Sequence, residues 1–278
     1  MKLIAGPSSP LLTKKIAEKT GFEIAETVYR RFPDGELYVM VRGDDDSYAV
    51  VNSLKSNEDI VYLMLIFDAL EGKSITAVIP YMGYARQDRA FLKGEAVSIR
   101  AVAKLIEEYA DRVITVNIHS ERARGHFRKL TELDAMKVIG QHYRGRDIVM
   151  LSPDRGSLSR VKRAAEIAEC EFDYLDKRRI DAENVEMVPR NLDIEGKEIA
   201  IVDDIISTGG TVITAAAQLS GKAKKIEAAC VHGVFAGNAL NRLFLSGISQ
   251  VKSTDTIETQ VSVLSISEII SEVLLDEV

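Results

Sequence analysis

Two adjacent carboxylates, Asp203 and Asp204, follow a continuous apolar run and stand directly before a loop of small polar residues. That loop consists of Ser207, Thr208, Gly209, Gly210 and Thr211. Hydroxyls and backbone N–H groups at the start of a helix bind an anion such as phosphate, because the helix dipole and the free donors both favour negative charge. The two acids suit neighbouring hydroxyl groups, or a metal bound to them. A phosphate beside a vicinal diol describes a ribose 5-phosphate.

The segments around this loop predict how it is positioned. Residues 198–202 have the apolar composition of a central parallel strand, and residues 211–219 have helical composition. A plain strand–turn–helix with a capping serine or threonine is the simpler interpretation. Two consecutive acids are hard to explain by a cap alone. The loop is not a Walker P-loop, and the partial match at 71–74 fails because Phe67 occupies its required first glycine.

Strand-like and helix-like segments alternate along most of the chain, which predicts parallel sheets with helices on both faces. The fold class is therefore α/β, and we predict two domains, 1–143 and 144–278. Two strands at 36–41 and 48–51 around an acidic turn predict a local hairpin. Residues 131–143 predict a helix.

Composition limits the class of protein. A net charge of −6 gives no reason to expect nucleic-acid binding. Cys170 and Cys230 lack metal-ligand spacing, so we interpret them as reduced core thiols of a cytoplasmic protein. The chain turns already at Gly6, too early for a signal peptide, and it has no long apolar stretch that predicts a membrane span.

A second polar loop, 81–89, follows a predicted strand, and such loops bind ligands in α/β sheets. In it, Arg86 and Arg89 could hold phosphates, and Gln87 or Asp88 could contact a base or ribose. A solvated loop is the alternative.

Four further clusters allow two interpretations each. The segment 31–36 could be a simple turn. His119 could ligate a metal or be merely hydrogen-bonded. Asp154 could cap the helix that follows it. The cations of 176–179 could be a solvated run or could neutralise phosphate charge.

In their order along the chain, these clusters resemble the ribose-phosphate pyrophosphokinase (PRPP synthetase) family, and the resemblance covers essentially the whole chain. Its most specific parts are Phe32–Glu36, Gly83–Arg89, Ser152–Asp154, Asp176–Arg179 and Val202–Thr211. The length of 278 residues resembles the compact archaeal forms.

The resemblance implies two phosphoribosyltransferase-like domains and the conversion of ATP and ribose 5-phosphate to PRPP and AMP. Asp203 and Asp204 would hold ribose hydroxyls, and Ser207 through Thr211 would cradle the 5-phosphate. Lys177 and Arg179 would sit on a mobile loop over the β-phosphate. The implied Mg²⁺ ligands are His119 and Asp154, and the implied ATP contacts are Arg86, Gln87 and Asp88, with Phe32, Asp34 and Glu36 supplied by the neighbouring subunit of a homo-oligomer, at least a dimer.

One departure concerns the turn after Asp154, where the family often has two glycines and this chain has Gly156 followed by Ser157. Two other functions stay open. A phosphoribosyltransferase that consumes PRPP would share the 203–211 loop, but it would not need His119 or the 177–179 cations. A non-catalytic regulatory homologue should have lost catalytic cations or acids, which are all present here.

Overall fold

The computed structural model describes residues 1–179, 185–189 and 192–276, and the side chains at 177–179 and 185–189 lie outside this description. The chain forms two compact units. Unit 1 comprises Met1–Asp134, Thr256–Glu258 and Ile266–Val278, and unit 2 comprises Ala135–Asp255 and Thr259–Ser265. The boundary predicted from the sequence, after residue 143, lies a little further along the chain. Both units are α/β, as the sequence predicts, and each is described by itself.

Unit 1 is built on a five-stranded, wholly parallel sheet in the order β1-β4-β5-β6-β7. The strands are β1 (Lys2–Ala5), β4 (Ser47–Val51), β5 (Ser74–Ile79), β6 (Arg112–Val116) and β7 (Leu130–Leu133). The predicted helix at 131–143 is therefore wrong in its first part. Leu130 pairs with Val113, so a sheet partner distant in sequence decides the conformation there.

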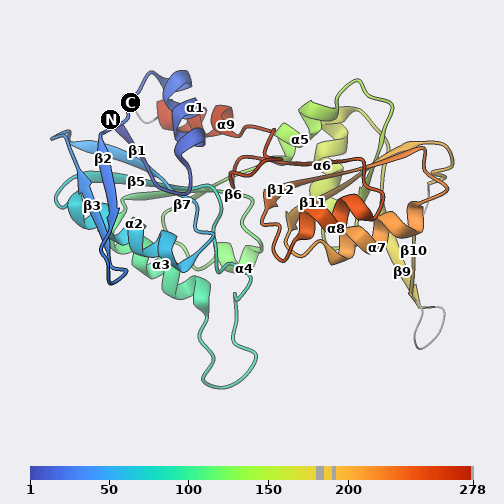
Figure 1. The fold of residues 1–278 in the computed structure, drawn as a ribbon, viewed down its shortest axis with the longest axis horizontal. Helices are drawn as coiled ribbons and strands as arrows, with labels where there is room; N and C mark the ends of the chain where they lie inside the picture. Colours follow the sequence, from blue (N-terminus) through green and yellow to red (C-terminus); the bar gives the residue numbers. More distant parts are fainter. Residues whose placement is uncertain (180–184, 190–191, 277–278) are drawn as a thin grey trace. The chain divides into compact units, whose positions relative to one another are not determined.

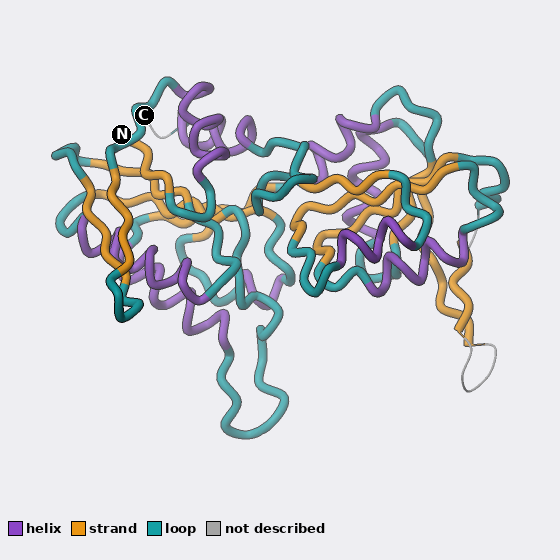
Figure 2. The backbone as a smooth tube through the Cα atoms, in the orientation of Figure 1, coloured by secondary structure: helices purple, strands orange, loops and turns teal. Residues whose placement is uncertain are grey.

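Helices cover both faces of this sheet. They are α1 (Pro10–Thr20), α2 (Asn57–Ala69), α3 (Ser98–Tyr109), the short α4 (Glu121–Arg124) and α9 (Ser267–Leu275). Figures 1 and 2 show α1 and α9 together on one face and α2 and α3 on the other. A capping box between Ser56 and Asp59 fixes the start of α2.

The hairpin of unit 1 differs from the predicted one. β2 (Thr27–Arg31) pairs antiparallel with β3 (Leu37–Val41), and the residues 32–36 form their turn. The predicted partner of β3, residues 48–51, instead lies in β4 of the central sheet. Ala49, Val50 and Val51 are fully buried, and three consecutive buried residues fit a strand covered on both faces.

Unit 2 has a six-stranded sheet in the order β10-β9-β8-β11-β12-β13, parallel except for β10. The strands are β8 (Val149–Ser152), β9 (Phe172–Arg179), β10 (Val185–Pro189), β11 (Glu198–Ile206), β12 (Lys225–Gly233) and β13 (Gln250–Ser253). β11 lies centrally, between β8 and β12, so the strand that carries the two acids is held on both sides.

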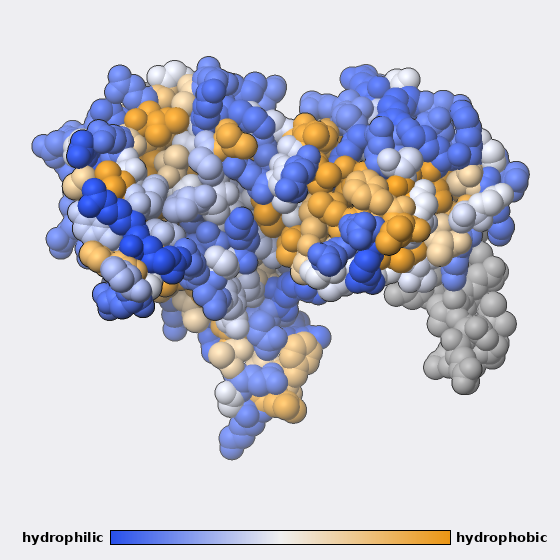
Figure 3. Space-filling model, viewed as in Figure 1, coloured by the Kyte–Doolittle hydropathy of each residue, from blue (hydrophilic) through white to orange (hydrophobic). Residues whose placement is uncertain are grey.

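The helices of unit 2 are α5 (Met136–Tyr143) and α6 (Leu158–Ala168) on one face, and α7 (Gly210–Leu219) and α8 (Ala239–Leu245) on the other (Figure 1). Figure 3 shows apolar side chains gathered over α7 and α8. Exposed apolar residues of this part of the chain include Phe244, Leu245 and Val263. Within the described residues, no helix has the length and apolar composition needed to cross a bilayer.

Candidate active site

The acid pair lies near the end of β11, inside the strand rather than after it. The strand continues to Ile206, four residues beyond the predicted end at 202. Asp204 is buried, and Asp203 accepts a hydrogen bond of 2.8 Å on Oδ1 from the backbone N–H of Asp204. Burial and the neighbouring Asp204 carboxylate raise the pKa of Asp203 well above its usual range. Asp203 therefore holds a proton to higher pH than an ordinary aspartate does. In its protonated form it can donate to a hydroxyl as well as accept from one.

The predicted phosphate loop connects β11 directly to α7. Gly209 precedes the helix with a φ of +74°, the left-handed region that favours glycine. A Cβ at this position would also lie 3.4 Å from the Leu243 side chain. No side chain caps α7, so its first backbone N–H groups remain available to an anion. The geometry fits a phosphate-binding turn that follows the strand carrying the two acids.

Asp154 lies in the turn between β8 and α6. Its Oδ1 accepts hydrogen bonds from the backbone N–H groups of Gly156, at 2.8 Å, and Ser157, at 3.1 Å. These bonds close the turn before α6, but the N-cap of that helix is Ser157 and no side chain caps it, so Asp154 is a turn residue and not the predicted cap. A role as a metal ligand stays a prediction. Ser157 also donates from Oγ to Asp203 Oδ1 at 2.7 Å. The structure thus brings the turn of Asp154 next to the acid pair.

Arg160, one turn into α6, completes this cluster. Its Nη2 lies 3.1 Å from Asp204 Oδ2. Neither Ser157 nor Arg160 was among the residues predicted from the sequence as site residues. They are 46 and 44 positions away from the acids they contact, and no local pattern links such distant positions.

In unit 1, the loop after β5 meets the segment after β6. Ser120, next to His119, donates a hydrogen bond of 2.6 Å to Asp88 Oδ2, and this bond lowers the pKa of Asp88. His126 Nε2 lies 3.1 Å from the backbone oxygen of Asp88. Arg86 is exposed, and Gln87 binds the backbone oxygen of Arg89 at 3.1 Å. Two clusters that are separate in the sequence, at 86–88 and 119–120, therefore form one polar surface.

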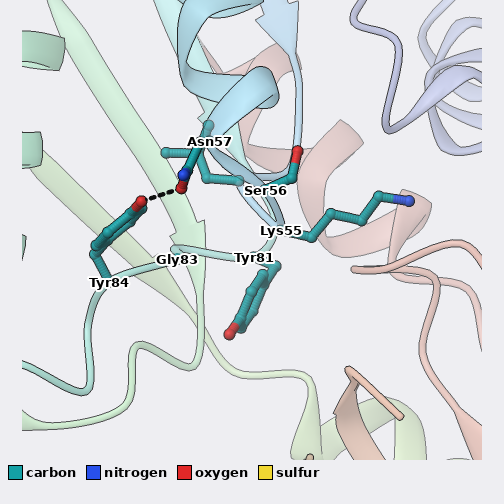
Figure 4. Close-up of a pocket in the computed structure, with 7 residues that line it drawn as sticks. Lys55, Ser56, Asn57, Tyr81, Gly83 and Tyr84 are labelled. Carbon is teal, nitrogen blue, oxygen red and sulfur yellow. Dashed lines mark hydrogen bonds between the residues drawn. The ribbon is translucent and has the colours of Figure 1, made fainter. Parts of the chain in front are cut away.

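A polar pocket of about 220 Å³ lies beside this loop. Its lining residues are Leu54, Lys55, Ser56, Asn57, Tyr81, Gly83 and Tyr84 (Figure 4). A Cβ on Gly83 would lie 2.0 Å from the backbone oxygen of Leu54, so only glycine allows this approach. Tyr84, with a φ of +64°, hydrogen-bonds the Asn57 side chain (Figure 4). These contacts fix the start of the loop that carries Arg86.

The turn of the β2–β3 hairpin carries Phe32, Asp34 and Glu36, all exposed. The backbone N–H of Phe32 donates to the oxygen of Glu36 at 2.8 Å, which closes the turn. Gly35 has a φ of +98°. An aromatic ring and two carboxylates are thus presented to solvent on a fixed two-stranded support.

Lys177 and Arg179 belong to β9, where they pair with Met187 and Val185 of β10. The resemblance implied a loop at these residues, but their backbone is that of a strand. Their side chains lie outside the described residues. β9 lies next to β8, the strand that leads to Asp154.

Two α/β units, one of them with a strand–acid pair–glycine turn–helix arrangement, define a phosphoribosyltransferase-type protein. Comparison with family models agrees. Residues 1–109 match the N-terminal domain of ribose phosphate pyrophosphokinase, and residues 127–265 match the phosphoribosyl transferase domain. The chain belongs to the ribose-phosphate pyrophosphokinase family.

Individual relatives support this assignment over the full length. Ribose-phosphate pyrophosphokinase 2 of Archaeoglobus fulgidus is 54% identical over 273 residues, covering 98% of this chain and 99% of the relative. The ribose-phosphate pyrophosphokinase of Methanosarcina acetivorans is 38% identical over 282 residues, covering 99% of each chain. The resemblance to the compact archaeal forms is confirmed.

A solved structure agrees as well. The crystal structure of phosphoribosylpyrophosphate synthetase from Mycobacterium smegmatis matches with a TM-score of 0.82 and 29% identity, covering 98% of this chain and 97% of that chain. The protein is therefore an enzyme, a transferase of the kinase type in PRPP and nucleotide synthesis. The comparisons favour this function over a PRPP-consuming transferase and over a non-catalytic homologue.

Proposed function

We propose that the chain transfers the pyrophosphoryl group of ATP to O1 of ribose 5-phosphate, giving PRPP and AMP. The observation that carries this proposal is the acid pair, which lies directly before an uncapped helix start with a left-handed glycine. Asp203 and Asp204 hold the ribose hydroxyls. Ser207 through Thr211 bind the 5-phosphate through backbone N–H groups and hydroxyls. The ribose is thereby held at both ends, with O1 fixed for attack.

ATP is assigned to the polar surface of unit 1. Arg86 is exposed and positively charged, and Gln87 and Asp88 lie beside it on a loop held by Ser120. An exposed arginine offers a rigid pair of donors to phosphate oxygens.

Phe32, Asp34 and Glu36 reach the adenine of a neighbouring subunit, so the active unit is a homo-oligomer, at least a dimer. Their exposure on a fixed turn supports this assignment. An exposed aromatic ring gives a base a stacking surface, and the carboxylates offer acceptors for its N–H groups.

Lys177 and Arg179 neutralise the charge that develops on the β-phosphate and the departing α-phosphate. Stabilisation of that charge by fixed donors is the main contribution a protein makes to such a transfer. Both residues lie in the part of β9 that pairs with β10 and extends past its pairing with β8.

Mg²⁺ is the metal we propose, with Asp154 and His119 near it. A carboxylate suits Mg²⁺, which keeps several waters and is usually held by one or two carboxylates together with substrate phosphates, whereas an imidazole suits it less well. Within the described residues, no group of three or more His, Cys, Asp or Glu gathers. When bound, the ion supplies positive charge to the phosphates.

The two cysteines, Cys170 and Cys230, are both free thiols, and burial raises the pKa of each. Free, unreactive thiols support a cytoplasmic location.

The experiment that tests the function is an incubation of the purified chain with ATP, Mg²⁺ and ribose 5-phosphate, followed by separation of the products. We expect AMP and PRPP in equal amounts, and none without ribose 5-phosphate. A matched incubation with PRPP and nucleobases in pyrophosphate-free buffer tests the alternative function, that of a phosphoribosyltransferase that consumes PRPP. Consumption of PRPP with a base, and no PRPP formation from ATP, would reject the proposal.

A further inference from the structure

Two side chains at the start of α6 contact the acid pair of β11. Ser157 donates to Asp203 Oδ1 at 2.7 Å, and Arg160 Nη2 lies 3.1 Å from Asp204 Oδ2. The same Arg160 nitrogen donates to Ser157 Oγ at 3.4 Å. One continuous chain of contacts therefore runs from Asp203 through Ser157 and Arg160 to Asp204.

These contacts fix both carboxylates. Oδ1 of Asp203 accepts from Ser157 and from the backbone N–H of Asp204, so two donors set the rotation of that carboxylate. The Asp204 side chain is 7% exposed and the Arg160 side chain 24%, so water screens their ion pair only weakly. The two acids thus have different partners: the hydroxyl of Ser157 contacts Asp203, and the guanidinium of Arg160 contacts Asp204.

The two partners also counter the repulsion between adjacent carboxylates. Without a cation beside Asp204, two adjacent acids, one buried and one partly buried, would each disfavour ionisation of the other. Arg160 places a positive charge 3.1 Å from Asp204 Oδ2, while Ser157 donates to Asp203 without adding a charge.

We propose that Ser157 and Arg160 are positioning residues, which orient Asp203 and Asp204 toward the hydroxyls of ribose 5-phosphate. This inference rests on the proposed function of the acid pair. Both residues act through the acids, which this assignment gives to the sugar and not to ATP. Their effect is therefore specific to the sugar substrate.

The test measures KM for each substrate in Ser157→Ala, Arg160→Met and Arg160→Lys variants of the full chain. Loss of one hydrogen bond to a charged group predicts a rise of about tenfold in the KM for ribose 5-phosphate in Ser157→Ala. Arg160→Met should raise it further, and Arg160→Lys should recover part of the loss. The KM for ATP should stay within about twofold of the wild type.

Ser159→Ala and Lys162→Met are the matched controls on the same helix. Ser159 is exposed, and Lys162 makes only a surface pair with Glu166 among its described contacts. Thermal unfolding of all variants separates positioning from loss of fold. Ser157→Ala should keep its unfolding temperature within a few degrees of Ser159→Ala.

A second sugar makes the test sharper. With 2-deoxyribose 5-phosphate, which lacks one hydroxyl, the penalty of Ser157→Ala should shrink, because part of the contact it supports is missing. An equal penalty with both sugars, an unchanged KM for ribose 5-phosphate, or a parallel rise of both KM values would overturn the inference.

Failure of the proposed function gives a different result. If the wild type forms no PRPP, calorimetric binding of ribose 5-phosphate to the same variants replaces KM. Wild-type binding that weakens in Ser157→Ala but not in Ser159→Ala would support positioning. Equal binding in both variants, or no binding to the wild type, would overturn it.

Discussion

Replacement of Asp203 by asparagine should stabilise the protein above neutral pH while removing part of the proposed ribose site. Burial and the Asp204 carboxylate raise the pKa of Asp203 from 3.8 to about 7. A carboxyl whose pKa is raised by folding binds a proton in the folded state that the unfolded chain has released. The stability of the wild type therefore falls as the pH rises from about 4 to about 7.

The size of this effect follows from the shift. Each pKa unit corresponds to about 1.4 kcal/mol, so a shift of about three units amounts to about 4 kcal/mol. This value is an upper limit, because Asp203 is only partly buried and water screens part of the effect. An asparagine carries no charge at any of these pH values. Asp203→Asn should lack this fall and should exceed the wild type in stability at about pH 8 by about 1–4 kcal/mol.

The assay is thermal unfolding followed by far-UV circular dichroism, at about pH 4 and about pH 8, without ligands. For a domain of this size, about 1 kcal/mol corresponds to roughly 2–4 °C in Tm. Asp147→Asn, at an exposed position of unit 2, is the control and should follow the wild type. A variant Asp203→Asn that loses stability at the higher pH, or that keeps the pH dependence of the wild type, would refute the reasoning.

Three other predictions concern activity. Gly209→Ala should raise the KM for ribose 5-phosphate by at least about tenfold with little effect on ATP, because alanine is strained at a φ of +74°; equal effects on both substrates in steady-state kinetics would speak against the phosphate turn. Lys177→Ala should lower kcat on the order of 10²-fold with little change in either KM; a rise in the KM for ATP alone would make Lys177 a ground-state contact. Mixing a Phe32→Ala and Glu36→Ala double variant with Lys177→Ala should restore part of the activity if sites are shared between subunits, and no recovery despite proven subunit exchange would reject the shared site.

The sequence predicts best where structure and chemistry are local. The segment 198–219 folds as a strand, an acid pair, a glycine turn and a helix, because apolar composition, Gly209 and the helix start all act within a few residues. Only the boundary moves, since pairing with β12 extends β11 to Ile206.

Long-range pairing explains what the sequence did not predict. Leu130–Leu133 has no strong local signal, and its pairing with β6 makes it a strand. Likewise, β3 pairs with β2 and not with residues 48–51. Residues 48–51 belong to β4, which pairs with β1 and β5 in the central sheet. The contacts of Ser157 and Arg160 with the acids depend on two adjacent strand ends in the folded sheet, and spacing along the chain does not reveal them.

The central claim is that the pyrophosphoryl group moves intact from ATP to ribose 5-phosphate. The most direct measurement uses ATP labelled in the β-phosphorus and, separately, in the α-phosphorus, with the products separated after a single turnover. The β label should appear in PRPP and the α label in AMP. A β label recovered in ADP or in free pyrophosphate, with unlabelled sugar phosphate, would contradict the account.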